Sequence, residues 1–193
     1  PLRGDASGHY RVHVIGNSGA LNSAEVAALL GIPHIPLDTV YWNPNWEKTP
    51  SSVFKDRVTA MLQDSENSHG GWVVDGNYNS YLGDLIADST TDVLWLDPPL
   101  ALYLPRLCLR TLKRLFGLVP PCSPNCPERV SEAFFSKDSI IWYSISHHWS
   151  LRKRESERYA VDGIHAGGKI RRLGGWGKDR AEWLRAVRAM VDG

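Results

Sequence analysis

The sequence is poor in the features that mark secreted and membrane proteins. Its 193 residues include only three cysteines, Cys108, Cys122 and Cys126, an odd and sparse set that argues against a disulfide scaffold. No apolar run approaches the length of about 20 residues that crosses a bilayer, and no signal peptide is recognisable. We therefore expect a cytoplasmic protein.

An excess of charge is also absent. The 22 Lys and Arg residues nearly balance the 21 Asp and Glu residues, which leaves a formal net charge of +1. General attraction to nucleic acid or to a membrane surface requires a strong positive balance, so we expect neither partner. The length and the 42% hydrophobic content suit one core. We expect a flexible lead-in at residues 1–9 and a single domain at residues 10–193.

What the sequence does contain is the first half of a phosphate-binding loop. A short β-branched strand is predicted at residues 11–15, and a glycine-rich segment follows it directly. This is the start of the G-x-x-x-x-G-K-[ST] pattern, whose backbone N–H groups hold nucleotide phosphates at a helix N-terminus. The residues predicted to bind the nucleotide are Gly16, Asn17, Ser18, Gly19 and Ala20.

The second half of the pattern is missing. Without a gap, Leu21 stands in place of the second glycine and Asn22 in place of the lysine, whereas Ser23 still matches the hydroxyl that reaches Mg²⁺. The loop has either diverged or lost about four residues of the type Gly-Lys-Ser-Thr after Ala20. The loss is favoured, because the helix that ends before Gly31 otherwise has barely two turns.

Strands and helices alternate along the rest of the chain. Further strands are predicted at 33–37, 71–74, 92–96 and 169–173. Helices are predicted at 51–62, 100–116, from about 128 or 131 to 159, and at 179–191. This alternation predicts an α/β fold, in which crossover helices flank a parallel sheet of about five strands in three α/β/α layers.

Acidic residues follow several predicted strands, at the edge where open α/β sheets bind their ligands. Asp97 closes an apolar strand and is predicted to hold Mg²⁺, directly or through water; the alternative is a helix N-cap before Pro98. Asp38 is predicted to be catalytic, orienting the acceptor and accepting its hydroxyl proton, with a turn residue as the alternative.

The acceptor itself is predicted to lie beside the same edge. Its predicted binding residues are Asp38, Trp42, Asp75, Gly76 and Asn77. The residues at 75–77 form a tight turn with hydrogen-bonding groups, and Trp42 offers a stacking surface. An ordinary turn and a tryptophan that covers the core from a loop are the alternatives.

Arginines provide the positive charge that phosphoryl transfer needs. Arg106 and Arg110 lie one helical turn apart and are predicted to be catalytic, by neutralising the charge that develops on the transferring group. A solvated helix face is the alternative. The charged stretch at 152–158 is expected to be a solvated patch, from which one or two arginines can move over the phosphates.

These motifs resemble those of small P-loop kinases of the adenylate kinase-like superfamily, and most closely the family of DNA topology modulation proteins. The resemblance rests on residues 14–20, 30–38, 73–78 and 93–97 and covers nearly the whole chain after residue 10. It implies a P-loop NTPase fold with a five-stranded parallel core and a mobile helical lid at about 106–159. In adenylate kinases, arginines after the fourth strand contact ATP, and Arg106 and Arg110 occupy matching positions.

The expected function is therefore that of an ATP-dependent phosphotransferase for a nucleotide or small metabolite, with ATP and Mg²⁺ as cofactors. Because the lysine is missing, the alternative is a catalytically inactive protein that binds a nucleotide or a protein partner. A role with nucleic acid, suggested by the name of the family, is opposed by the balanced charge.

Overall fold

A five-stranded parallel sheet forms the centre of the computed structural model, which describes residues 1–16, 23–121, 123–127 and 139–193. The strand order is β2-β5-β1-β6-β7, and every neighbouring pair is parallel. The strands are β1 (Arg11–Gly16), β2 (His34–Pro36), β5 (Trp72–Asp75), β6 (Asp92–Asp97) and β7 (Ile170–Gly174). The predicted α/β fold with about five parallel strands is confirmed.

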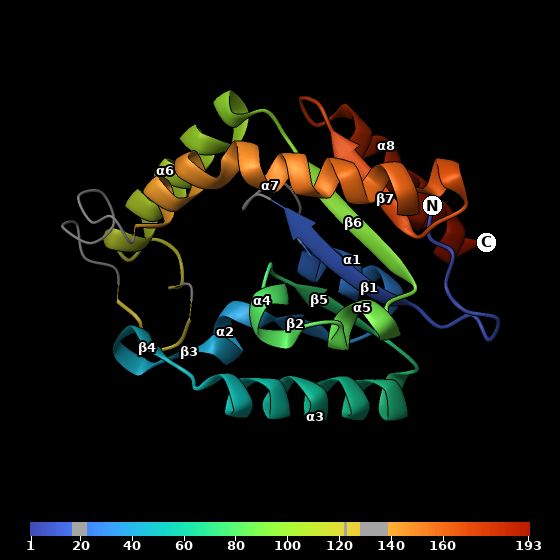
Figure 1. Cartoon of the computed structure of the whole chain (residues 1–193), viewed down its shortest axis with the longest axis horizontal. Coiled ribbons are helices and arrows are strands. Elements are labelled where there is room, and N and C mark those ends of the chain that lie inside the picture. Colours follow the sequence, from blue (N-terminus) through green and yellow to red (C-terminus); the bar gives the residue numbers. More distant parts are fainter. Residues whose placement is uncertain (17–22, 122, 128–138) are drawn as a thin grey trace.

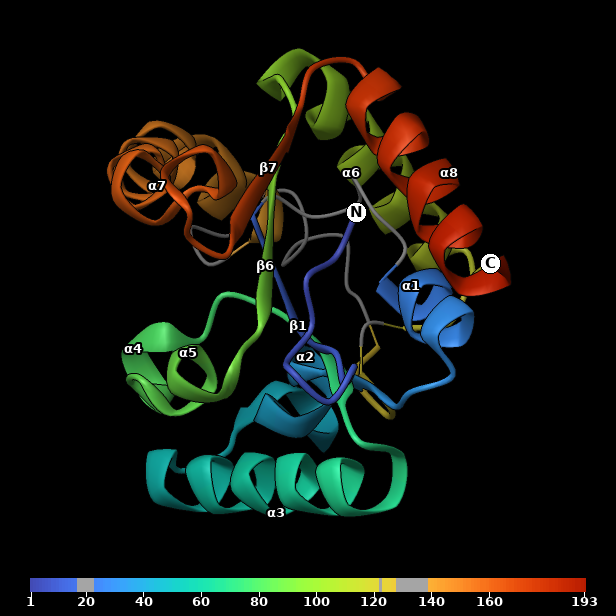
Figure 2. The ribbon, with the colours of Figure 1, turned by 90° about the vertical axis from the view of Figure 1, so that its right-hand side faces the viewer.

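Helices cover both faces of the sheet, because the strands are apolar on both sides. Within β1, Val12 and Val14 pack into one cluster, whereas Ile15 faces the opposite side. The first face is covered by α1 (Ser23–Leu30) and α8 (Lys178–Asp192). Figure 2 shows these two helices on one side of the strands and α4 (Asn79–Leu82), α5 (Leu85–Ser89) and α7 (Ile140–Asp162) on the other.

The remaining elements cover the rest of the second face and the carboxyl edge of the sheet. The second face also carries α2 (Leu37–Tyr41) and α3 (Ser51–His69), and a small antiparallel hairpin joins them, formed by β3 (Trp42–Asn43) and β4 (Glu47–Lys48). Beyond β6, α6 (Leu100–Leu115) packs against α7, which passes over the carboxyl ends of the strands (Figure 1).

Several predicted boundaries are corrected. The helix predicted at 51–62 continues to His69 and ends at Gly70, whose φ of 72° places it in the left-handed region. The polar residues of its last two turns, of which only Ser65 is buried, hide this extension from a hydrophobic pattern. The strand predicted at 33–37 stops at Pro36, so Asp38 lies in the first turn of α2 and not at a strand end. The first part of the long helix predicted from 128 or 131 lies outside the described residues.

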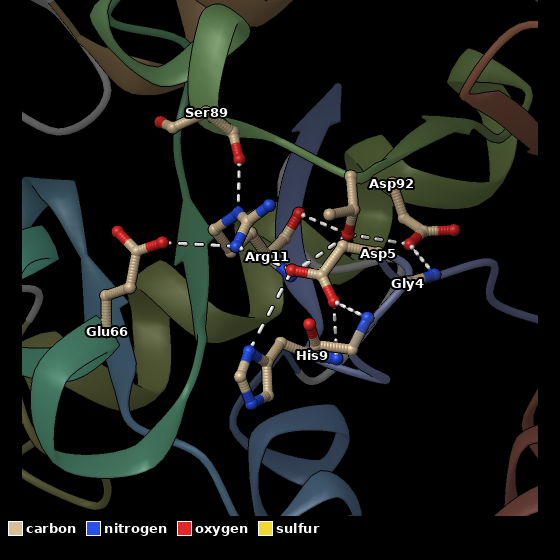
Figure 3. A network of polar contacts seen from close by, with 9 residues as sticks. Gly4, Asp5, His9, Arg11, Glu66, Ser89 and Asp92 are labelled. Carbon is tan, nitrogen blue, oxygen red and sulfur yellow. Dashed lines mark hydrogen bonds and ion pairs between the residues drawn. The ribbon is translucent and has the colours of Figure 1, made fainter.

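The N-terminal segment packs against the sheet, where the sequence predicts a flexible lead-in. The backbone N–H groups of Arg3 and Gly4 donate to the carboxylate of Asp92, at 2.8 and 3.0 Å. Asp5 forms an ion pair with Arg11 at 3.0 Å (Figure 3), and Leu2 is buried in the core. These contacts lie at the amino ends of the strands, opposite the edge where ligands are expected.

Candidate functional site

Gly16 marks the point where the chain leaves β1, and Asn77 holds it there. The Gly16 N–H donates to Asn77 Oδ1 at 3.1 Å, and Asn77 Nδ2 donates to the Gly16 carbonyl at 2.9 Å. A Cβ at Gly16, where φ is 119°, would lie 2.2 Å from the Leu96 carbonyl oxygen, so this position requires glycine. The other predicted nucleotide-binding residues, Asn17, Ser18, Gly19 and Ala20, lie outside the described residues.

A serine, an aspartate and a histidine meet beside this point. Ser23, the first residue of α1, donates its hydroxyl to Asp75 Oδ2 at 2.6 Å. The Nε2 atom of His34 lies 2.9 Å from the same hydroxyl oxygen and donates to it, since the single hydroxyl hydrogen goes to Asp75. The Ser23 hydroxyl is thereby fixed at the carboxyl end of β5, next to β1.

The surroundings of Asp75 disfavour the ionised form of its carboxyl group. Burial raises the pKa of the Asp75 carboxyl, and the nearby negative charge of Asp38 raises it further. The hydrogen bond from Ser23 and the positive charges of His34 and Arg110 act in the opposite direction. Asp75, Asp38 and Arg110, three of the predicted site residues, are therefore close enough to interact electrostatically.

Two of the predicted acceptor residues, Asp38 and Trp42, lie beside an aromatic cluster. Tyr78 donates its hydroxyl to Asp38 Oδ1 at 2.6 Å, and its ring packs 4.9 Å from that of Tyr41. Trp42 makes an edge contact with Tyr41 at 4.9 Å and another with Trp46 at 5.5 Å, and it stays partly exposed. Asp38 thus lies near Asp75 and Trp42 packs on the aromatic cluster, whereas the side chain of Asn77 is engaged with Gly16.

Asp97 has a different environment from Asp75. Its side chain is only 2% exposed, and both carboxylate oxygens take part in ion pairs. Arg152 of α7 lies with Nε 3.1 Å from Oδ1, and Arg172 of β7 donates to Oδ2 through Nε at 2.9 Å and through Nη2. The helix-cap alternative is not observed, because Pro99 precedes α6 and no side chain caps it.

The two predicted catalytic arginines lie in different parts of the site. Arg110 interacts electrostatically with Asp75, as described above. Arg106 is exposed and lines a cavity of about 180 Å³ between α6, the end of β7 and the start of α8. The walls of this cavity include Leu102, Trp176 and Arg180.

Sequence reasoning missed Arg172, Trp176 and Arg180, and it placed Arg152 in a solvated patch. The glycine-rich segment 174–177 follows the last strand, so the strand-end argument applied to Asp97 points equally to Trp176. Nothing local to Arg152 or Arg172 identifies Asp97 as their partner, which lies 75 positions before Arg172.

Comparison with known proteins identifies the fold. The chain matches no family model and no curated protein. Among solved structures it is similar to a shikimate kinase from Bacteroides thetaiotaomicron, with a TM-score of 0.50 over 95% of this chain and 97% of that chain. This chain shares the α/β fold of that kinase. At 15% sequence identity the likeness concerns the fold alone, and the narrower resemblance to DNA topology modulation proteins is not confirmed.

Two further observations concern the described part of the chain. None of its helices is long and apolar enough to cross a membrane. Nor do three or more His, Cys, Asp or Glu side chains gather there as a metal-binding group. A magnesium ion that is held mainly by substrate phosphates and water needs only one or two protein oxygens, so the second observation is compatible with a magnesium site.

Proposed function

We propose that the protein is an ATP-dependent phosphotransferase that acts on a small acceptor molecule. The hydrogen bond between Ser23 and Asp75 carries this proposal. In P-loop enzymes Mg²⁺ is held by a hydroxyl at the start of the helix after the phosphate loop and by an aspartate at a strand end. Ser23 and Asp75 have these two positions, on α1 and on the neighbour of β1 in the sheet.

The donor set at Ser23 and Asp75 suits magnesium, which prefers oxygen ligands. A bound cation would also offset the burial that raises the pKa of Asp75. Asp97, the residue predicted from the sequence, suits the ion less well because arginines already occupy both of its oxygens. We therefore assign Asp75 in place of Asp97. The ion supplies charge neutralisation at the transferring phosphoryl group.

The two substrates occupy opposite ends of the sheet edge in this proposal. The cavity beside Arg106, Trp176 and Arg180 takes the base of ATP, since it combines apolar walls with groups that stack on a planar ring. The acceptor lies on the side of β2 and α2, where Asp38 accepts its hydroxyl proton and Arg110 contributes positive charge. Donor and acceptor then flank the transferred group, as in-line transfer requires.

Titration of Mg-ATP and measurement of phosphate release test this proposal. We expect Asp75→Asn and Ser23→Ala to weaken Mg-ATP binding at least about tenfold and to abolish turnover. Asp88→Asn and Ser52→Ala, both exposed, serve as controls that keep the wild-type affinity. Equal binding by wild type and Asp75→Asn, with and without EDTA, contradicts the magnesium assignment.

A second candidate is a nucleotide-binding protein without catalytic activity. It is favoured by Asn22, which stands where the motif has the lysine that contacts the β- and γ-phosphates. Acceptor screening separates the two candidates, using nucleoside monophosphates together with shikimate, the acceptor in the name of the structural neighbour. Binding that depends on Mg²⁺ and Asp75, without phosphate release or transfer, supports the second candidate.

A further inference from the structure

The ion pairs of Asp97 connect three elements at the phosphate end of the site. Asp97 ends β6, Arg172 belongs to β7, and Arg152 projects from α7. The guanidinium of Arg172 also lies over the ring of Trp95, with 5.0 Å between its carbon and the ring centroid. Arg172 and Asp97 are thus held on the sheet, and Asp97 in turn holds Arg152 of the overlying helix.

The guanidinium of Arg152 is oriented by this contact and stays accessible. The side chain is 46% exposed, although its partner Asp97 is almost fully buried. Its ion pair with Asp97 is formed through Nε. A guanidinium carries five N–H donors in one plane, so a contact at Nε fixes the plane and leaves the outer edge for another acceptor. That edge is the one that binds phosphate oxygens in pairs.

The location matches the start of the phosphate loop. Arg152 lines a small pocket together with Gly16, Asn77 and Asp97, so it lies beside the end of β1. Gly16 is the first residue of the incomplete loop motif, in which Asn22 occupies the place of the lysine. Arg152, from another part of the chain, therefore places a guanidinium beside the residue at which the loop motif begins.

The charge around this pocket suits an anion. Glu155, also buried and on the same pocket, forms ion pairs with Arg154 at 2.9 Å and with Arg158 at 2.8 Å. Within these described ion pairs, four guanidinium groups face two carboxylates. Two positive charges remain without a counter-charge from the two acids, on side chains that are 37–53% exposed and so can be reached by an anion.

We propose that Arg152 supplies the positive charge that the missing lysine supplies in complete phosphate loops, and that Asp97 is the positioning residue that holds it. The inference rests on the proposed function, since the anion is the terminal phosphate group of the bound nucleotide. Asp97 then contributes to nucleotide binding through Arg152, by reducing the rotamer freedom that a long side chain loses on binding.

Calorimetric titration with Mg-ATP, Mg-ADP and AMP tests the role of Arg152. Replacement Arg152→Ala should weaken Mg-ATP binding at least about tenfold, weaken Mg-ADP binding less, and leave AMP binding unchanged, because the lost contact is to the terminal phosphates. Arg152→Lys keeps the charge but loses the planar fork, so it should recover only part of the affinity. Lys153→Ala, an exposed neighbour on the same helix, is the matched control and should bind like wild type.

A double-mutant cycle tests the positioning role of Asp97. Asp97→Asn alone should weaken Mg-ATP binding about threefold to tenfold, whereas it should add nothing in the Arg152→Ala background, because Asp97 acts through Arg152. A merely structural role predicts equal losses in both backgrounds and overturns the assignment of Asp97. Circular dichroism shows whether Asp97→Asn folds. If it does not, the Mg-ATP affinities of Arg152→Lys and Arg152→Ala are compared instead, to test whether an oriented guanidinium at position 152 is needed.

The outcomes separate this inference from the proposed function. Wild-type affinity for Mg-ATP in Arg152→Ala, with a loss in Asp75→Asn, overturns the inference and leaves the phosphotransferase proposal in place. Inorganic tripolyphosphate provides a probe without a base. If the wild type binds neither tripolyphosphate nor Mg-ATP, both proposals are overturned.

Discussion

Acidification should destabilise the protein through His13, which lies in the centre of β1. The side chain is 4% exposed, and its neutral ring donates from Nε2 to the Gly76 carbonyl at 3.0 Å. Burial lowers the pKa of His13 from 6.5 to about 4; the hydrogen bond to Gly76 opposes this shift, and the charges of Arg158 and Lys169 add to it. The unfolded chain keeps the ordinary pKa, so at intermediate pH it binds a proton that the folded chain does not.

The size of the effect follows from the two pKa values. Each pKa unit corresponds to about 1.4 kcal/mol. A decrease of the pKa from 6.5 to about 4 therefore lowers the unfolding free energy by about 3 kcal/mol when the pH is below the folded-state pKa. The contribution is fully present above pH 6.5 and is lost as the pH falls toward 4. At pH 5.5 the loss relative to pH 8 is about 1.4 kcal/mol.

Urea unfolding of wild type and His13→Gln across this pH range measures the contribution. Glutamine keeps an N–H for the Gly76 carbonyl but does not titrate, so the difference between the two proteins isolates His13. His34 and His148, whose pKa values burial also lowers, change stability in the same direction, and the raised pKa of Asp75 acts in the opposite direction. These groups titrate in both proteins and cancel in the comparison.

The two stability curves should therefore converge as the pH falls. The advantage of wild type over His13→Gln at pH 8 should shrink by about 1.4 kcal/mol at pH 5.5 and by about 3 kcal/mol near pH 4. Parallel curves would refute the reasoning, because they would show that His13 binds its proton equally in the folded and unfolded chains.

Two further predictions concern contacts far from His13. Asp92→Ala removes the acceptor of the Arg3 and Gly4 N–H groups and should lower the unfolding free energy by about 2–3 kcal/mol in urea titrations. A change no larger than that of the exposed control Asp88→Ala contradicts it. Trp46→Phe removes the 2.9 Å hydrogen bond from Trp46 Nε1 to the Pro127 carbonyl and should speed amide hydrogen exchange at 123–126, with a global loss of about 1 kcal/mol at most. Unchanged exchange there would show that the bond does not hold this segment.

The sequence predicts well those parts of the fold in which a hydrophobic pattern extends over several consecutive residues. Strands β1 and β6 each carry a run of buried, mostly apolar residues that stops at Gly16 and at Asp97, so their predicted boundaries agree with the structure to within one residue. Helix α6 is predicted at 100–116 and spans Leu100–Leu115. Such segments carry their own signal, because burial on both sides of a parallel sheet demands continuous hydrophobicity.

Short elements carry no comparable signal. The five-residue helix α2 and the two-residue strands β3 and β4 are shorter than the window in which periodicity can be recognised. Their conformations depend on tertiary contacts, such as the hydrogen bonds that join Trp42 and Asn43 to Ser123 and Cys126. The proposed acceptor side of the site is built from these elements, which is why its geometry could not be predicted from the sequence.

The two strand-end aspartates show where prediction of a site from one sequence stops. Asp75 and Asp97 each end an apolar strand, and both strands neighbour β1. Their roles depend on their partners, which are distant in the sequence. Ser23 lies 52 positions from Asp75, and Arg172 lies 75 positions from Asp97. Arg172 lies two residues after the buried Ile170 and shares its side of β7, but Arg172 itself is exposed. An exposed arginine needs no carboxylate partner, so the pattern of the two strands does not single out the ion pair between Asp97 and Arg172. Only the tertiary structure, which brings the carboxyl end of β6 beside β7, pairs these two residues.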